Sequence, residues 1–97
     1  AQADEALDWA VAQLWAQVAV DASGIEITPP PGLPRVLALR LLERVMANFS
    51  APSPRGGELL RWLESLEAGG VATLGGIKAD GRGGTWRFML APKHRSA

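Results

Sequence analysis

The sequence IKADGRGGTWRFML, residues 77–90, decides the fold class of this chain. Residues 77–80 alternate apolar and polar side chains, as expected for a strand with one buried face. The glycine-rich residues 81–84 can supply the positive backbone angles of a hairpin loop, and residues 85–90 form the returning strand. The sequence therefore predicts a two-stranded β-hairpin.

The side chains of the returning strand alternate between two faces. One face carries Trp86, Phe88 and Leu90, and the other carries Arg87 and Met89. We expect Trp86 and Phe88 to belong to the core rather than to stack on nucleic-acid bases.

The segment before the hairpin is also apolar, but two glycines interrupt it. Residues 71–74 are followed by Gly75 and Gly76, which permit a bulge or a close approach of the backbone.

Three helices precede the hairpin. Apolar residues recur at steps of three and four in residues 4–20 and 34–48, which predicts a helix in each range. A third helix is expected after Ser53 and Pro54, an N-cap followed by a first-turn proline, and runs to about residue 68. Gly56 and Gly57 weaken its first turn, so the regular helix is expected to begin at Glu58.

Between the first two helices, residues 25–28 alternate like a short strand and residues 29–32 form a stiff, extended connector. The predicted fold is a small α+β domain of three helices, a short strand and a C-terminal β-hairpin, in the order helix-strand-helix-helix-hairpin. Residues 1–21 are the leading helix, and residues 22–97 hold the helix pair and the hairpin.

Length and composition exclude several classes of protein. At 97 residues the chain has room for a single domain. It has no cysteine and one histidine, which excludes a disulfide framework, a thiolate zinc site and histidine-based metal clusters. No apolar stretch approaches the roughly 20 residues of a membrane span, and the acidic start does not resemble a signal peptide. We therefore expect a soluble, cytoplasmic protein without a membrane partner, and the absence of an initiator methionine suggests a fragment of a longer chain.

The ten basic and ten acidic side chains are unevenly distributed. Residues 1–34 contain five acidic and no basic side chains, whereas residues 35–97 contain all ten basic side chains and five acidic ones. If the fold keeps these two parts apart, the second offers a basic surface to an anionic partner such as nucleic acid. The alternative is ordinary solvated surface charge.

The common signatures of catalysis are missing. The chain has no glycine-rich phosphate loop with Lys-Ser/Thr, and residues 81–84 belong to a hairpin rather than to a strand-to-helix turn. No carboxylate stands at a recognisable spacing from a second carboxylate or from His94, which we expect to be a surface residue. We therefore expect this chain to be non-catalytic.

A winged helix-turn-helix has the same order of elements and is a rival interpretation. In that fold the second helix of the turn enters the major groove and presents basic and amide groups. The third predicted helix presents Glu58, Glu64 and Glu67 against Arg61, and carboxylates repel phosphates. This pattern disfavours sequence-specific DNA binding.

Trp9 falls on the polar side of the first predicted helix, beside Gln13 and Gln17. It is either a single exposed apolar side chain or the place where an absent domain docks.

An ordered set of segments from Leu33 to Arg95 resembles the region that follows the catalytic domain in bacterial tRNA(Ile)-lysidine synthases. The segments are the arginine-bearing helix from Pro34 to Arg44, APSPR at residues 51–55, LLRWL at 59–63, ATLGG at 72–76 and Gly84-x-Trp86-x-Phe88. The leading helix and residues 25–28 also resemble the connecting helix of that family and the segment after it.

The resemblance implies a parent enzyme that uses ATP and lysine to convert the wobble cytidine of an isoleucine tRNA into lysidine. The family's pyrophosphatase motif, Ser-Gly-Gly-x-Asp-Ser, has no counterpart here, so no catalytic residue is carried over. The chain resembles the substrate-binding domain, with no cofactor of its own, and ATP and Mg²⁺ are expected in the absent catalytic domain.

Charge and resemblance together predict a surface that contacts the tRNA backbone rather than base edges. The candidate nucleic-acid-binding residues are Arg35, Arg40, Arg44, Lys78, Arg82 and Arg87. Trp9 is the candidate contact to the absent catalytic domain. The alternative is a structural spacer that docks on that domain and touches no RNA.

Overall fold

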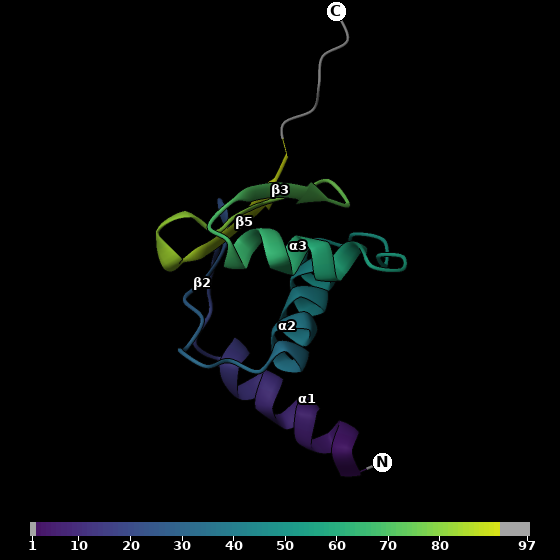
Figure 1. Cartoon of the computed structure of the whole chain (residues 1–97). Coiled ribbons are helices and arrows are strands. Elements are labelled where there is room, and N and C mark those ends of the chain that lie inside the picture. Colours follow the sequence, from purple (N-terminus) through teal and green to yellow (C-terminus); the bar gives the residue numbers. More distant parts are fainter. Residues whose placement is uncertain (1, 92–97) are drawn as a thin grey trace, which may run out of the picture.

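The computed structural model describes residues 2–91, which form three helices and one five-stranded antiparallel sheet (Figure 1). The elements are α1 (Gln2–Trp15), β1 (Ala19–Asp21), β2 (Gly24–Ile27), α2 (Arg35–Asn48), α3 (Glu58–Glu67), β3 (Val71–Leu74), β4 (Ile77–Asp80), a 3₁₀ turn (Arg82–Gly84) and β5 (Trp86–Leu90). Across the sheet the strands follow the order β1-β2-β5-β4-β3. The prediction of an α+β domain is confirmed.

The core lies between one face of the sheet and helices α2 and α3. Strands β2, β4 and β5 alternate, and their inward side chains are almost fully buried: Ile25, Ile27, Ile77, Ala79, Trp86 and Phe88. The helices contribute Ala38, Leu42, Val45, Met46, Trp62, Leu63 and Leu66. The rings of Trp62 and Phe88 meet edge to face with their centroids 5.4 Å apart. The prediction that Trp86 and Phe88 belong to the core is confirmed.

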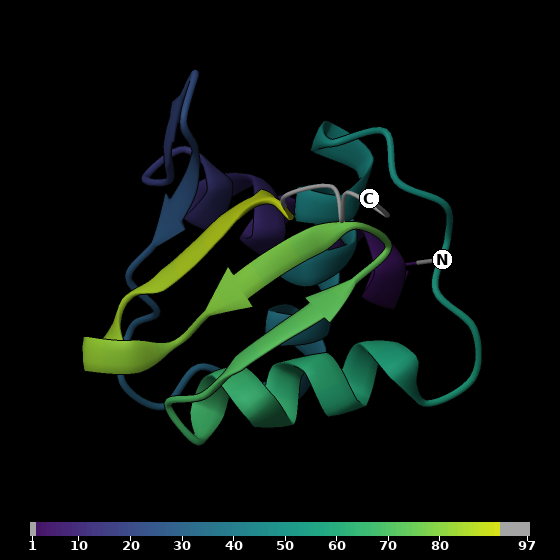
Figure 2. The ribbon, with the colours of Figure 1, turned by 90° about the horizontal axis from the view of Figure 1, so that it is seen from above.

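Figures 1 and 2 show that α3 runs beneath the sheet and that no described helix covers the opposite face, here called the outer face. Helix α1 lies at the end of the molecule away from the sheet and packs on α2. No helix within residues 2–91 has the length and apolarity that a bilayer crossing requires.

The first helix is shorter than predicted, because it ends at Trp15 and residues 19–21 form the edge strand β1. The Asp21 carboxylate accepts hydrogen bonds from the backbone N–H groups of Ser23 and Gly24, which closes a tight turn into β2. These bonds favour pairing of residues 19–21 with β2 over another helical turn. Val18 lies beyond the end of the helix. It fitted the helical spacing of apolar residues because its side chain also packs on the core.

The predicted hairpin of residues 77–90 is confirmed as β4 and β5, and a third strand extends it to a meander. Residues 71–74 form β3, which pairs with β4, and Gly75 and Gly76 make the turn between them rather than a bulge. Both glycines have positive φ, 59° and 79°, as a two-residue type I′ turn requires. The predicted loop between β4 and β5 is confirmed, with φ of 78° and 82° at Gly83 and Gly84.

The second and third helices follow the sequence closely. Helix α2 begins one residue after the predicted start, and α3 begins at Glu58, as the two glycines indicated. Its N-cap is Gly57 rather than Ser53, and the Glu58 carboxylate accepts a hydrogen bond from the backbone N–H of Arg55. Gly69, with φ of 75°, follows the helix in the left-handed conformation that commonly ends helices.

Leu90 was expected on the same face as Trp86 and Phe88, yet its side chain is 65% exposed. Strand β2 pairs with β5 only as far as Phe88, so Leu90 has a strand neighbour on one side alone, at Ile77. The alternation is correct, but the sheet ends before it can cover this side chain.

Candidate nucleic-acid interface

The outer face of the sheet is the surface that the fold leaves open to a large partner. Because side chains alternate, the residues between the buried ones point outward, and register aligns Glu26, Arg87 and Asp80 in one row across β2, β5 and β4. The next row places Met89 beside Lys78. Basic and acidic side chains therefore alternate on this face.

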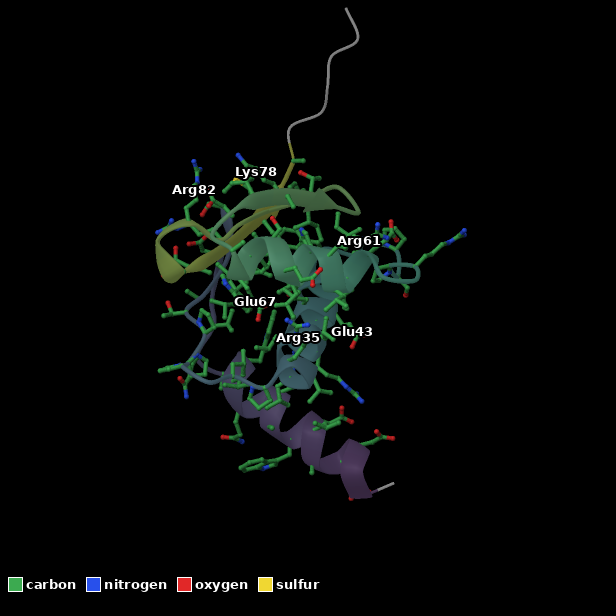
Figure 3. The ribbon with its side chains drawn as sticks, in the orientation of Figure 1. Arg35, Glu43, Arg61, Glu67, Lys78 and Arg82 are labelled. Carbon is green, nitrogen blue, oxygen red and sulfur yellow. The ribbon has the colours of Figure 1, made fainter. Side chains whose placement is uncertain are left out.

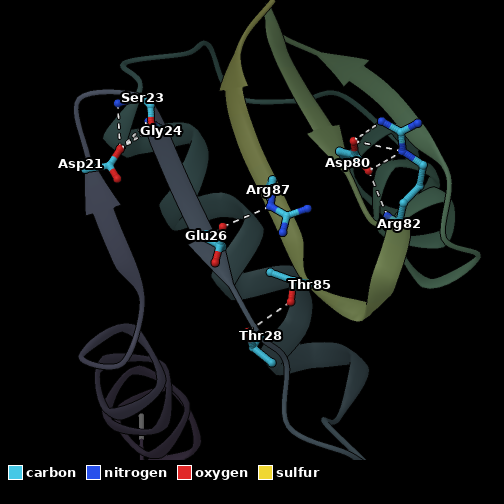
Figure 4. A network of polar contacts seen from close by, with 9 residues as sticks. All are labelled: Asp21, Ser23, Gly24, Glu26, Thr28, Asp80, Arg82, Thr85 and Arg87. Atoms are coloured by element: carbon cyan, nitrogen blue, oxygen red, sulfur yellow. Dashed lines mark hydrogen bonds and ion pairs between the residues drawn. The ribbon is translucent and has the colours of Figure 1, made fainter.

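Arg82 is bound to Asp80 at the end of this face (Figure 4). Its Nε donates to both carboxylate oxygens, at 3.0 and 3.2 Å, and its Nη2 donates to Oδ2 at 2.6 Å. The backbone N–H of Arg82 donates to Oδ1 at 3.0 Å. These bonds lower the pKa of the Asp80 carboxyl to about 2, with a smaller contribution from the charge of Lys78, and the carboxylate raises the pKa of Arg82.

Arg87 is anchored on the neighbouring strand. Its Nε donates to the Glu26 carboxylate at 3.1 Å, and both side chains are about half exposed, 52% each. Thr28 and Thr85 lie near this pair with their hydroxyl oxygens 3.4 Å apart (Figure 4). Lys78 is the one candidate on this face that forms no ion pair with a residue in the described part of the chain.

The three candidates on α2 belong to a different surface. Arg35 lies 3.3 Å from the Glu67 carboxylate, and Arg40 lies 3.6 and 3.4 Å from those of Asp4 and Asp8. The guanidinium of Arg44 stacks over the ring of Trp15, 5.0 Å from its centroid.

The six candidates therefore do not form one patch. Lys78 and Arg82 project from the sheet on the side away from α3, whereas Arg35 and Glu67 meet on the other side of that helix (Figure 3). The fold also does not keep the acidic and basic parts of the sequence apart, since Asp8 pairs with Arg40 and Glu26 pairs with Arg87. Exposed pairs of this kind stabilise a fold by at most ~1 kcal/mol, so a phosphate can compete for the cations. As nucleic-acid contacts, the six residues stay a prediction.

The sequence analysis missed Asp80 as part of this site. The signal was its position two residues before Arg82 in a glycine-rich turn, where a carboxylate can reach both the backbone and the side chain of the arginine.

Trp9 is exposed, as its position on the helical wheel predicted. It is 67% exposed on α1, the helix that packs on α2. A tryptophan this accessible leaves a large apolar surface in contact with water. Whether another domain covers it stays a prediction.

The DNA-binding rival finds no physical support in α3. Glu58, Glu64 and Glu67 are all exposed along this helix, and Arg61 is the basic side chain that accompanies them. A helix with this charge repels the phosphates that line a major groove.

The described residues hold no cluster of three or more histidine, cysteine, aspartate or glutamate side chains that could bind a metal ion. Lys93, His94 and Arg95 lie outside the described residues.

Comparison with known proteins gave one strong match. The chain is 57% identical over 96 residues to a tRNA(Ile)-lysidine synthase of Novosphingobium aromaticivorans, an alignment that covers 99% of this chain and 29% of the relative. The chain thus spans less than a third of the length of the curated relative it matches. No protein-family profile matches it, and no solved structure does. The chain is therefore homologous to one part of a tRNA(Ile)-lysidine synthase, which confirms its resemblance to that family.

Proposed function

We propose that this chain is a non-catalytic domain of a tRNA(Ile)-lysidine synthase and that it helps to position the tRNA. The parent enzyme, in this proposal, is an ATP-dependent ligase that converts the wobble cytidine of isoleucine tRNA to lysidine. The observation that carries it is the 57% identity along almost the whole chain. In this proposal the catalytic part of the parent binds ATP and Mg²⁺. The partners of the chain are tRNA and that catalytic part, and the location is cytoplasmic.

The outer face of the sheet is the surface that best suits this role. It is broad and free of described helices. It presents Arg82 and Arg87 (Figure 4) together with Lys78 (Figure 3). It has no exposed aromatic ring for stacking on bases, because Trp86 and Phe88 are buried beneath it. Contacts with the phosphate backbone therefore suit it better than base-specific contacts.

A gel-shift titration of the 97-residue chain with isoleucine tRNA at low salt tests the proposal. We expect a retarded complex, and we expect the double substitution Arg82→Glu/Arg87→Glu to weaken it strongly. Arg55→Glu/Arg61→Glu is the matched control, since it reverses two exposed arginines of the α3 region and changes the net charge equally. Absence of a complex with the unaltered chain, or an equal loss in both doubles, would overturn the proposal.

Docking on the catalytic part is a second role, which the exposure of Trp9 favours. If the ring of Trp9 is buried in the parent enzyme, Trp9→Ala lowers the melting temperature of the parent and leaves that of the 97-residue chain unchanged. An equal effect in both proteins, or no effect in either, would remove this role. The two roles use different surfaces and are compatible.

A further inference from the structure

The turn that carries Arg82 is fixed to the body of the domain. Gly81, immediately before it, is buried, and its backbone N–H donates to the carbonyl of Gly70 at 2.9 Å. A Cβ atom at Gly81 would lie 2.4 Å from the carbonyl oxygen of Leu66, so this backbone rests directly on the end of α3. The position of residues 80–82 is thus determined by a helix rather than by a free loop.

The side chain of Arg82 is held by several bonds on one edge only. Nε and Nη2 both donate to the Asp80 carboxylate, whereas no described residue accepts a hydrogen bond from Nη1. The Asp80 side chain is 14% exposed and that of Arg82 is 69% exposed. The pair therefore hides its anion and presents the free edge of its cation to solvent.

The other arginine–carboxylate pairs of the described chain lack this geometry. Arg35 with Glu67, Arg87 with Glu26 and Arg40 with Asp8 are each joined by a single hydrogen bond, at 3.3, 3.1 and 3.4 Å. Arg40 also lies 3.6 Å from a second carboxylate, that of Asp4. One bond leaves the guanidinium free to turn, whereas two bonds to one carboxylate fix its plane.

We propose that Asp80 is a positioning residue, which holds Arg82 as a preorganised donor to one phosphate of the RNA backbone. This inference rests on the proposed function and goes beyond it by assigning a role to a carboxylate. A phosphate that meets the free edge of the guanidinium is closer to the cation than to Asp80, so attraction exceeds repulsion at contact. Because the side chain is already ordered, binding loses less conformational entropy than it would with a free arginine.

The substitution Asp80→Asn distinguishes this proposal from charge counting, the alternative in which only the net charge of the outer face decides the affinity. It removes a negative charge from the outer face, so charge counting predicts tighter binding of tRNA. Positioning predicts the opposite, because an amide binds the guanidinium less firmly and Arg82 becomes mobile. We expect the affinity for isoleucine tRNA to fall about 3- to 10-fold in the D80N chain.

Two substitutions of Arg82 complete the test in the same gel-shift titration. Arg82→Ala is expected to lower the affinity about 10-fold, and Arg82→Lys to lower it nearly as much, because lysine keeps the charge without the planar fork. The double variant D80N/R82A should bind no more weakly than R82A alone. If D80N is too unstable for the titration, R82K carries the test, since it keeps both Asp80 and the charge.

Glu67→Gln is the matched control, because it also neutralises a carboxylate paired with an arginine, away from the outer face. It should not weaken the complex. Binding by D80N as tight as that of the unaltered chain, or unchanged binding by R82A, would overturn the inference and leave the proposed function standing. A lack of binding by the unaltered chain would overturn the proposed function itself.

Discussion

Gly57 and Gly81 have nearly the same backbone angles but very different surroundings. Their φ and ψ are −87° and 9° at Gly57 and −99° and 8° at Gly81, which most residues can adopt. A Cβ at Gly57 would approach nothing closer than 3.9 Å, whereas at Gly81 it would meet the backbone of Leu66 at 2.4 Å. Gly81 is therefore required for lack of space rather than for its conformation.

We expect Gly81→Ala to lower the free energy of unfolding by about 2–3 kcal/mol, since a helix backbone must move to admit the methyl group. Gly57→Ala, its conformational match, should change this free energy by less than ~0.5 kcal/mol. Urea titrations of the two variants measure both values. Equal effects at the two positions would contradict the steric explanation.

The pKa of Asp80 makes a prediction about acid stability. Because Arg82 lowers it from 3.8 to about 2, the carboxyl is deprotonated in the folded state at pH values where the unfolded chain binds a proton. Its contribution is fully present above pH 4 and is lost as the pH falls through 4 towards 2. Thermal melts should show a steeper loss of stability over this range in the unaltered chain than in D80N. Parallel curves for the two proteins would be inconsistent with the ion pair.

Buried residues can be predicted from the sequence better than the residues that form ion pairs. Trp86 and Phe88 were assigned to the core correctly because alternation in a strand is local. The face of Leu90 was also predicted correctly, but its exposure was not predictable because it depends on where β2 ends. Asp80 was overlooked because its role depends on the geometry of a turn rather than on residue type.

At the scale of the elements, α2 and α3 were predictable because their spacing and glycine signals are local. The strands β1 and β3 were not predicted, although each pairs with a strand close in sequence. Each has only three or four residues, and in both cases a short turn decides the pairing: the Asp21 turn and the Gly75-Gly76 turn. Turn chemistry was therefore the missing information.

Helix α1 should open more readily than the rest of the domain. Val11 is the one buried side chain in its residues 4–15, and the helix packs mainly on α2. We expect Val11→Ala, at a cost of about 1–2 kcal/mol, to accelerate amide hydrogen exchange in α1 and to leave β4 and β5 protected. Val45→Ala, in the central core, should accelerate exchange throughout the domain. Uniform acceleration by Val11→Ala would mean that α1 unfolds only together with the core.

At the scale of the whole molecule, the charge pattern along the sequence proved a poor guide to the surface. Glu26 and Arg87 are 61 residues apart in sequence, and Asp8 and Arg40 are 32 apart, yet both pairs are in contact. A count of charges along the sequence cannot detect such pairing, because it depends on the tertiary fold. The candidate residues were therefore identifiable as exposed cations, but their division between two surfaces was not.

The modest charge of the outer face predicts a shallow salt dependence of tRNA binding. If Lys78, Arg82 and Arg87 replace counterions, the logarithm of the association constant should fall with the logarithm of the salt concentration with a slope of about −2 to −3. Filter-binding titrations at several salt concentrations give this slope. A value beyond about −5 would require many more phosphate contacts than this face can make.

The position of β5 in the sheet has a consequence for synthesis on the ribosome. β5 is the last strand of the described chain, yet it lies between β2 and β4 and joins them. Until residues 86–90 have left the exit tunnel, the nascent β1–β2 hairpin and the β3–β4 hairpin have no strand to connect them. Translation must therefore deliver nearly the whole described chain before the sheet can close.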